Sequence, residues 1–70
     1  MIYDVKGYKL NKDTGNYEEV NHQYEAYADE ADARARLYTA EWGYDLATVT
    51  ECCDSGLPEV TYYARGKIVA

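Results

Sequence analysis

The chain has 70 residues, with 13 acidic and 7 basic side chains and a net charge of −6. This excess of acid argues against unaided binding to DNA, RNA or an anionic membrane. No apolar run approaches the roughly 20 residues of a membrane span, and the start Met1-Ile2-Tyr3-Asp4 is unlike a signal peptide, so we expect one cytoplasmic domain, residues 1–70.

The N-terminal part of the chain predicts a β-hairpin. Residues 2–10 alternate in a way that is typical of a strand, with Tyr3 and Val5 on one face. The turn NKDTGN follows, with Gly15 expected in the left-handed conformation. Residues 17–27 predict the return strand. Its inward face would carry Val20, His22, Tyr24 and Ala26, and its water-facing side Glu19, Asn21, Gln23, Glu25 and Tyr27.

Residues 28–43, ADEADARARLYTAEWG, predict the single helix. Asp29 is expected to be the N-cap, because its carboxylate can accept from the free amides of the first turn. Gly43 is expected to end the helix in the left-handed conformation. The predicted core stripe consists of Ala31, Ala35, Tyr38 and Trp42.

Two further strands complete the predicted fold. Residues 44–53 are rich in β-branched side chains, residues 54–58 predict a turn, and residues 59–68 predict a last strand with a bulge at Gly66. The order is β-β-α-β-β. We therefore expect an α+β fold, a four-stranded, mostly antiparallel sheet with one helix packed on one face.

Leu37 lies off the core stripe, on a second apolar strip with Ala33 and Ala40. An isolated exposed leucine is ordinary on a protein surface. A helix that is apolar on two sides can also contact a partner with the second side. Leu37 is therefore a candidate contact residue.

The sequence offers few groups for catalysis or metal binding. Cys52 and Cys53 are adjacent, and in a strand they would point to opposite faces as reduced thiols. A zinc site needs about four ligands, and His22 is the only histidine. A small enzyme that uses Cys52 or Cys53 with His22 is one hypothesis for the function, but the sequence contains no phosphate loop and no nucleophile motif. We expect no enzyme, no cofactor and no metal, and we expect His22 to be packed inward.

The most distinctive feature is a stretch of acid. Residues 13–32 contain seven acidic side chains and neither lysine nor arginine. One interpretation is a solvated surface that keeps a small protein soluble. The other is a surface for a basic partner, because carboxylates spaced along a strand and a helix could line part of a nucleic-acid-binding groove. The seven acids are Asp13, Glu18, Glu19, Glu25, Asp29, Glu30 and Asp32.

In its small size, its acidity and its lack of a catalytic motif, the sequence is similar to inhibitor proteins encoded by phages and mobile elements, including anti-CRISPR proteins. The acidic stretch from Asp13 to Asp32 carries this similarity. It implies a non-enzymatic inhibitor that occupies a basic, nucleic-acid-binding surface of its target. The predicted contact residues are Glu18, Glu19, Glu25, Asp29, Glu30 and Asp32, with Tyr17 and Tyr27 as aromatic anchors.

The alternative is a structural module without a basic target. It would form a homodimer, or dock on a larger complex, through an exposed sheet edge or through the Leu37 strip. Neither hypothesis involves direct contact with nucleic acid or membrane.

Overall fold

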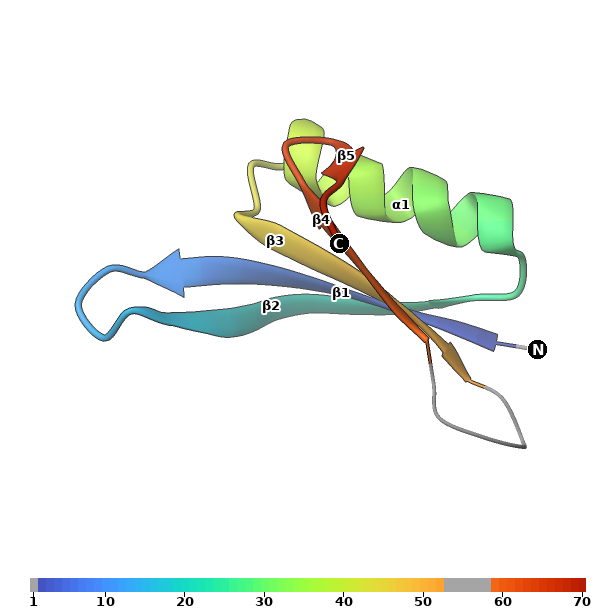
Figure 1. Cartoon of the computed structure of the whole chain (residues 1–70), viewed down its shortest axis with the longest axis horizontal. Helices are drawn as coiled ribbons and strands as arrows, with labels where there is room; N and C mark the ends of the chain where they lie inside the picture. Colours follow the sequence, from blue (N-terminus) through green and yellow to red (C-terminus); the bar gives the residue numbers. More distant parts are fainter. Residues whose placement is uncertain (1, 53–58) are drawn as a thin grey trace.

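A computed structural model describes residues 2–52 and 59–70. These residues form one antiparallel sheet, which one helix covers on one face (Figure 1). The strand order in the sheet is β2-β1-β3-β4-β5. The α+β class and the order of the predicted elements are confirmed, with one short strand more than expected. The elements are β1 (Ile2–Asn11), β2 (Asn16–Glu25), α1 (Ala28–Ala40), β3 (Leu46–Cys52), β4 (Val60–Ala64) and β5 (Lys67–Ile68).

The additional strand arises because the chain folds back within the predicted last strand. Arg65 and Gly66 have φ angles of 53° and 76°, and Ala64 pairs with Lys67 across them. Two consecutive residues with positive φ form the tight turn that suits the twist of a hairpin. The predicted bulge at Gly66 is therefore wrong, and Gly66 instead belongs to the turn between β4 and β5.

The β1–β2 hairpin has the predicted turn. Gly15 has a φ angle of 77°, and its amide donates to the Asn11 carbonyl over 2.7 Å. Asn11 also accepts from the Asp13 amide through its side-chain oxygen, which tightens the turn. The hairpin projects beyond the end of the helix (Figure 1).

The predicted faces of β2 are reversed between Asn21 and Glu25. Tyr3 and Val5 face the helix, and their partners across the hairpin are Glu25 and Gln23, so this part of the polar set is on the helix side. Glu19, on the other side of the bulge, pairs with Tyr8 and lies on the open face with Lys6. The predicted inward residues Tyr24 and His22 lie on the open face. The register shifts at β1 residues Gly7 and Tyr8, which pair with Asn21 and Glu19 and leave Val20 as an extra residue. Because β2 is an edge strand, the core does not depend on its apolar side chains.

The helix begins two residues earlier than the predicted cap implies. Tyr27 is the N-cap, with an extended backbone and no side-chain capping bond. Asp29 is the second helical residue, where its Oδ1 accepts from the Glu30 amide over 3.0 Å, so the prediction that Asp29 caps the helix is wrong. Gly43 has the expected left-handed conformation, with a φ angle of 72°, and the Tyr44 amide donates back to the Tyr38 carbonyl.

The core lies between α1 and the sheet. Tyr38 is its largest fully buried side chain. Trp42, predicted in the core stripe, is 45% exposed because the helix ends before it, although its ring lies 5.0 Å from that of Tyr38. Burying these few groups supplies most of the apolar stabilisation. The buried apolar residues are Val5, Ala31, Ala35, Tyr38, Ala47, Val49 and Tyr63.

Two predictions fall partly or wholly outside the described residues. Cys53 and the turn predicted at residues 54–58 are among the residues that the structure does not describe. Cys52 ends β3 and pairs with Ile2. Among the helices of the described ranges, none is long and apolar enough to cross a membrane.

Candidate protein-binding surface

The start of α1 combines an exposed aromatic ring with acidic side chains. Tyr27 is 65% exposed. Asp29 and Glu30 follow it in the first helical turn and are both exposed. Within the described part of the chain, neither carboxylate forms an ion pair. Acidic side chains at this end of a helix interact favourably with its dipole, and here both are accessible to a partner.

A groove runs from this end along the side of α1 that faces β2. It encloses about 550 Å³ and is lined by Glu25, Glu30, Ala33, Arg34 and Leu37. Leu37 is half-buried at its far end, with Ala33 between it and the acidic start. Part of the predicted Leu37 strip and part of the acidic stretch therefore belong to one surface.

Glu25 contributes less charge to this surface than its sequence position suggests. Arg34 Nε donates to Glu25 Oε1 over 2.6 Å, joining the helix to β2. This hydrogen bond is the main cause that raises the pKa of Arg34 above its ordinary value. The pair is charge-neutral, and it fixes the floor of the groove between Glu30 and Leu37.

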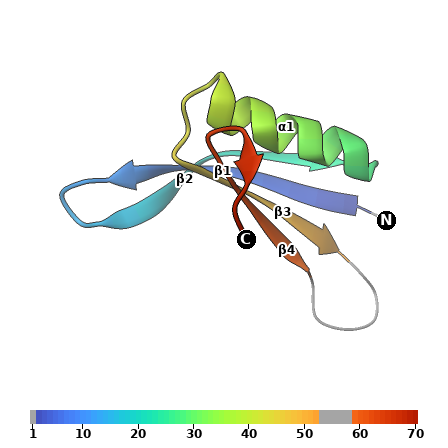
Figure 2. The same cartoon turned by 45° about the horizontal axis from the view of Figure 1, so that its top comes forward.

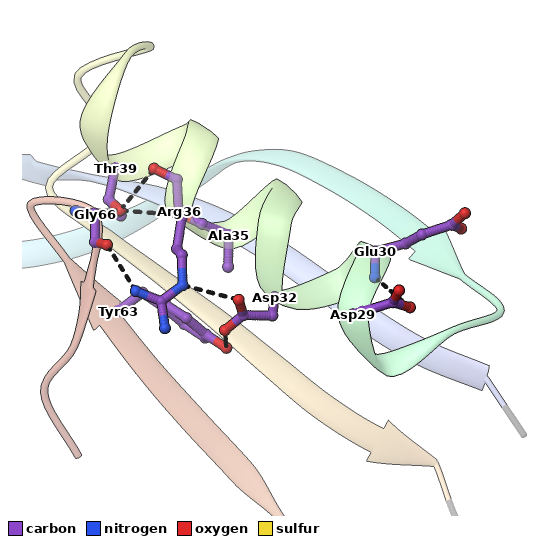
Figure 3. Close-up of polar contacts among 8 residues, drawn as sticks. All are labelled: Asp29, Glu30, Asp32, Ala35, Arg36, Thr39, Tyr63 and Gly66. Atoms are coloured by element: carbon purple, nitrogen blue, oxygen red, sulfur yellow. Dashed lines mark hydrogen bonds and ion pairs between the residues drawn. The ribbon is translucent and has the colours of Figure 1, made fainter.

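Asp32 lies on the other side of α1, toward β4 (Figure 3). Its Oδ1 accepts from the Tyr63 hydroxyl over 2.7 Å, and its Oδ2 accepts from Arg36 Nε over 2.8 Å. The bond from Arg36 is the main cause that lowers the pKa of Asp32. Burial, followed by the bond to Asp32, raises the pKa of Tyr63 to about 12.

The same network holds the turn between β4 and β5 against the helix. Arg36 Nη1 donates to the Gly66 carbonyl over 3.1 Å, and the Gly66 amide donates to Thr39 Oγ1 over 2.9 Å (Figure 3). A Cβ on Gly66 would lie 2.9 Å from that of Ala40, so only glycine allows this approach. We call these contacts of Asp32, Arg36, Thr39, Tyr63 and Gly66 the helix clamp.

The other predicted contact residues lie on the β1–β2 hairpin. Glu19 forms an ion pair with Lys6 over 3.6 Å on the open face. The pKa of Lys6 is raised, mainly by Asp4 and also by Glu19. Glu18 is exposed opposite Lys9 and forms no ion pair in residues 2–52 or 59–70. Tyr17 is half-exposed near the hairpin tip.

The nine predicted contact residues thus divide into three places. The first place is the start of α1 and the groove that adjoins it, where Tyr27, Asp29 and Glu30 lie at the helix start and Glu25, Glu30 and Leu37 line the groove. The second is the β1–β2 hairpin, which carries Tyr17, Glu18 and Glu19. Asp32 belongs to the helix clamp. Three of the six predicted acids already have a basic partner, namely Glu19, Glu25 and Asp32.

A pairing that the sequence interpretation missed lies on the open face of the sheet. His22 Nε2 is 2.5 Å from Asp4 Oδ1. Asp4 Oδ1 is buried and, within the described residues, accepts no hydrogen bond of good geometry, so its close polar neighbour is His22 Nε2. The predicted inward position of His22 is wrong, because the face of β2 that carries it is open. Once the Val20 bulge is known, the hairpin register places His22 opposite Lys6, on the same face as Asp4 and diagonal to it.

The described residues show little that points to metal or nucleophilic chemistry. Within those residues, no three His, Cys, Asp or Glu side chains gather closely enough to hold a metal ion. His22 is in contact with Asp4 and with the ring of Tyr24, 4.7 Å away. Comparisons with models of protein families, with curated proteins and with solved structures gave no match.

Proposed function

We propose that the protein is a non-enzymatic binding module that engages a basic surface of another protein through the start of α1. The contact residues are Tyr27, Asp29 and Glu30, extended along the groove to Leu37. The paired acids Glu19, Glu25 and Asp32 are secondary to them, because their carboxylates already have basic partners.

Tyr27 is the observation that carries the proposal. It occupies the N-cap, where Ser, Thr, Asp or Asn would satisfy a free helix amide and stabilise the helix by about 1 kcal/mol. The chain instead has a large ring there, 65% exposed, beside two acids that form no ion pair with any described residue. A position that violates a local rule of stability is a candidate for function. Exposed tyrosine is a frequent anchor in protein interfaces.

The most concrete form of this function is inhibition of a nucleic-acid-handling protein, as in the phage-encoded and mobile-element-encoded inhibitors that the sequence resembles. Asp29 and Glu30 would take the place of phosphates on the target's Lys and Arg side chains, with Tyr27 stacked beside them. Glu19, Glu25 and Asp32 already have basic partners. The surface that imitates phosphates would therefore be the short segment at the start of α1, and it would not extend along a long groove.

The test is affinity capture from a nuclease-treated bacterial lysate, followed by direct binding measurements with the captured protein. We expect a basic, nucleic-acid-handling protein that is retained at about 0.1 M salt and released at about 0.5 M, since salt screens exposed charge pairs. The combined variant Asp29→Lys with Glu30→Lys should abolish the binding. The double variant Glu41→Lys with Glu59→Lys is the matched control, because it makes the same charge change at exposed acids elsewhere.

Binding that survives reversal of Asp29 and Glu30, or that the Glu41 and Glu59 control weakens equally, would refute the proposed surface. Circular dichroism of every variant separates loss of contact from loss of fold. Tyr27→Ser adds a second readout, because it should weaken binding while the helix becomes more stable.

A second candidate function is self-association through β2. This strand has ten residues and lies at the edge of the sheet, with β1 as its neighbour on one side only (Figure 2). An exposed edge can pair with a second strand. Antiparallel pairing of two β2 strands centred on Asn21 would place Glu19 opposite Gln23 and Glu18 opposite Tyr24, so no glutamate would face another.

Charge substitution at Gln23 tests this second candidate. Gln23→Glu would oppose Glu19 of the other copy and lower the dimer fraction, whereas Gln23→Lys would raise it. Leu37→Glu is the parallel test for a dimer that uses the Leu37 strip. Analytical ultracentrifugation measures both, and a monomer at every concentration of the unmodified protein would eliminate self-association.

A further inference from the structure

At the other end of α1 lies a second surface with different chemistry. A cleft of about 870 Å³ is bounded by the β1–β2 hairpin, the segment after the helix and the β4–β5 hairpin. Drug-sized ligand sites usually occupy about 300–1,000 Å³, so the cleft has room for several side chains. Its apolar walls include Leu10 and Tyr17 from one hairpin and Ile68 and Val69 from the other.

The exposed apolar groups of the walls are unusual for so small and acidic a chain. Tyr17, Ile68 and Val69 are all more than half exposed, and Leu10 is partly exposed. They come from parts of the chain more than forty residues apart, yet they border the same cleft. Clustered exposed apolar groups with a polar rim are typical of binding sites.

The charged groups of the cleft favour an anion. Arg65 and Lys67 both line it, and neither forms an ion pair with any other residue in the described ranges. The one acid in the lining, Asp45, accepts a hydrogen bond from the Leu10 amide over 2.7 Å. That hydrogen bond links the Asp45 carboxylate to the β1–β2 hairpin. In a protein of net charge −6, the cleft thus carries a local excess of positive charge.

Arg65 is held in place at a cost in backbone energy. Its φ angle of 53° lies in the left-handed region, which non-glycine residues other than Asn and Asp rarely adopt. Asn, Asp or Gly would suit this turn position better. The adjoining Gly66 is fixed to the helix by its bonds with Thr39 and Arg36 (Figure 3). A strained residue supported by a rigid neighbour is a frequent property of binding sites.

We infer that this cleft binds an extended, acidic segment of a partner protein. Carboxylates of the segment pair with Arg65 and Lys67. Its apolar side chains lie between the two hairpins, against Tyr17 and Ile68. An arginine fork and a carboxylate form a bidentate, charge-assisted contact, and the apolar walls favour a peptide with aliphatic side chains over a compact inorganic anion.

This site is independent of the acidic surface at the start of α1. The helix has 13 residues at about 1.5 Å of rise each, so the two surfaces lie about 20 Å apart. They carry opposite charge and would take different partners. Tyr17, grouped from the sequence with the acidic contact residues, belongs to this second site.

Binding of defined probes to the full-length protein tests the inference. The probes are a short capped peptide of alternating glutamate and leucine, its glutamine and lysine counterparts, and decanoate as a small anionic amphiphile. We expect the glutamate peptide to bind about tenfold or more tightly than its glutamine counterpart, since each charge-assisted bond is worth more than a neutral one. The lysine peptide should bind to the cleft least.

Two substitutions assign the binding to the cleft. Arg65→Asn suits the left-handed conformation, so it should raise the melting temperature while it lowers glutamate-peptide binding about tenfold. Tyr17→Ser should also weaken binding without a change in charge. Lys12→Gln is the matched control for loss of a cation, because Lys12 does not line the cleft, and it should leave binding unchanged.

Equal binding of the three peptides, or binding that Arg65→Asn leaves intact, would overturn the inference. Binding of decanoate without binding of the glutamate peptide would also overturn it, in favour of a small-molecule site. The neutralising variant Asp29→Asn with Glu30→Gln should not alter peptide binding, so failure of the acidic surface and failure of the cleft give different results.

Discussion

The two sides of α1 use similar residues for different purposes. Toward β4 and β5, Asp32 and Arg36 join Tyr63 and Gly66 in the helix clamp, and three hydrogen bonds connect the helix to that hairpin. Toward β2, Arg34 and Glu25 form one such link, and a groove remains beside it. Polar contacts of the helix therefore anchor it firmly to the sheet on the side of β4 and β5. On the side of β2 they leave an exposed groove.

The largest change in the free energy of unfolding is expected from a substitution at Gly66, in the helix clamp. Gly66→Ala forces a side chain into the left-handed region and against Ala40, and we expect a loss of about 2–5 kcal/mol of unfolding free energy. Gly15→Ala is the control, because its φ angle is similar and its Cβ would meet no atom within 4 Å. It should cost about 1–2 kcal/mol. Equal losses of unfolding free energy for the two variants, measured by urea denaturation, would show that the close approach of Gly66 to Ala40 contributes nothing to stability.

Tyr63→Phe should have the next largest effect. Tyr63 is 3% exposed and donates to a charged acceptor, so removing its hydroxyl should cost about 1–2 kcal/mol. Its folded pKa of about 12 lies above the ordinary value of 10.0, so its contribution is complete below pH 10 and is lost as the pH rises toward 12.

The pH dependence of stability separates the two partners of that bond. The pKa of Asp32 is lowered from 3.8, so its contribution is complete above that pH and is lost as the pH falls. Subtracting the Tyr63→Phe profile from that of the unmodified protein should leave an alkaline difference between about pH 10 and 12. A difference of constant size across that range would contradict the assigned bond.

Tyr27→Ser should stabilise the protein by about 0.5–1 kcal/mol, because a serine at the N-cap can accept from a free amide of the first turn. Thermal unfolding measures the change, and Tyr27→Ala is the control that removes the ring without adding a cap. A gain for alanine as large as that for serine would indicate that the ring itself strains the helix start.

The smallest effect is expected on the side of the groove. Glu25→Gln should lower stability by about 0.5 kcal/mol, since the ion pair with Arg34 is partly exposed to solvent. The loss should shrink further at 0.5 M salt. A loss comparable to that of Tyr63→Phe would mean that both sides of α1 are clamped, and the contrast between them would disappear.

The elements that the sequence predicted well are those with a local cause. The turn at Gly15 and the turn at Gly43 that follows the helix each depend on one residue that tolerates a positive φ angle, although the helix itself ends at Ala40, three residues before Gly43. Ala31, Ala35 and Tyr38 face the core because helical spacing places them on one stripe. The helix start was misplaced because Asp29 is a better cap by type than Tyr27, which nevertheless occupies the position.

The surfaces were harder to predict because they depend on register and on contacts across the fold. The bulge at Val20 puts Asn21, Gln23 and Glu25 on the helix side of β2 and leaves Glu19 on the open face. The pairing of Asp32 with Tyr63 joins residues 31 positions apart, which no local pattern signals. Arg65 could have been noted as a residue before glycine in a β-rich segment, a common turn signal.

The position of β1 has a consequence for how the chain folds. It precedes the other strands of the sheet, and it pairs with β2 next along the chain and with β3 more than thirty residues later. The hairpin can form early, but the core needs Val49 and Tyr63, which come last. Loop closure over such separations slows folding. During synthesis one side of β1 therefore stays open until β2, α1 and β3 have been made.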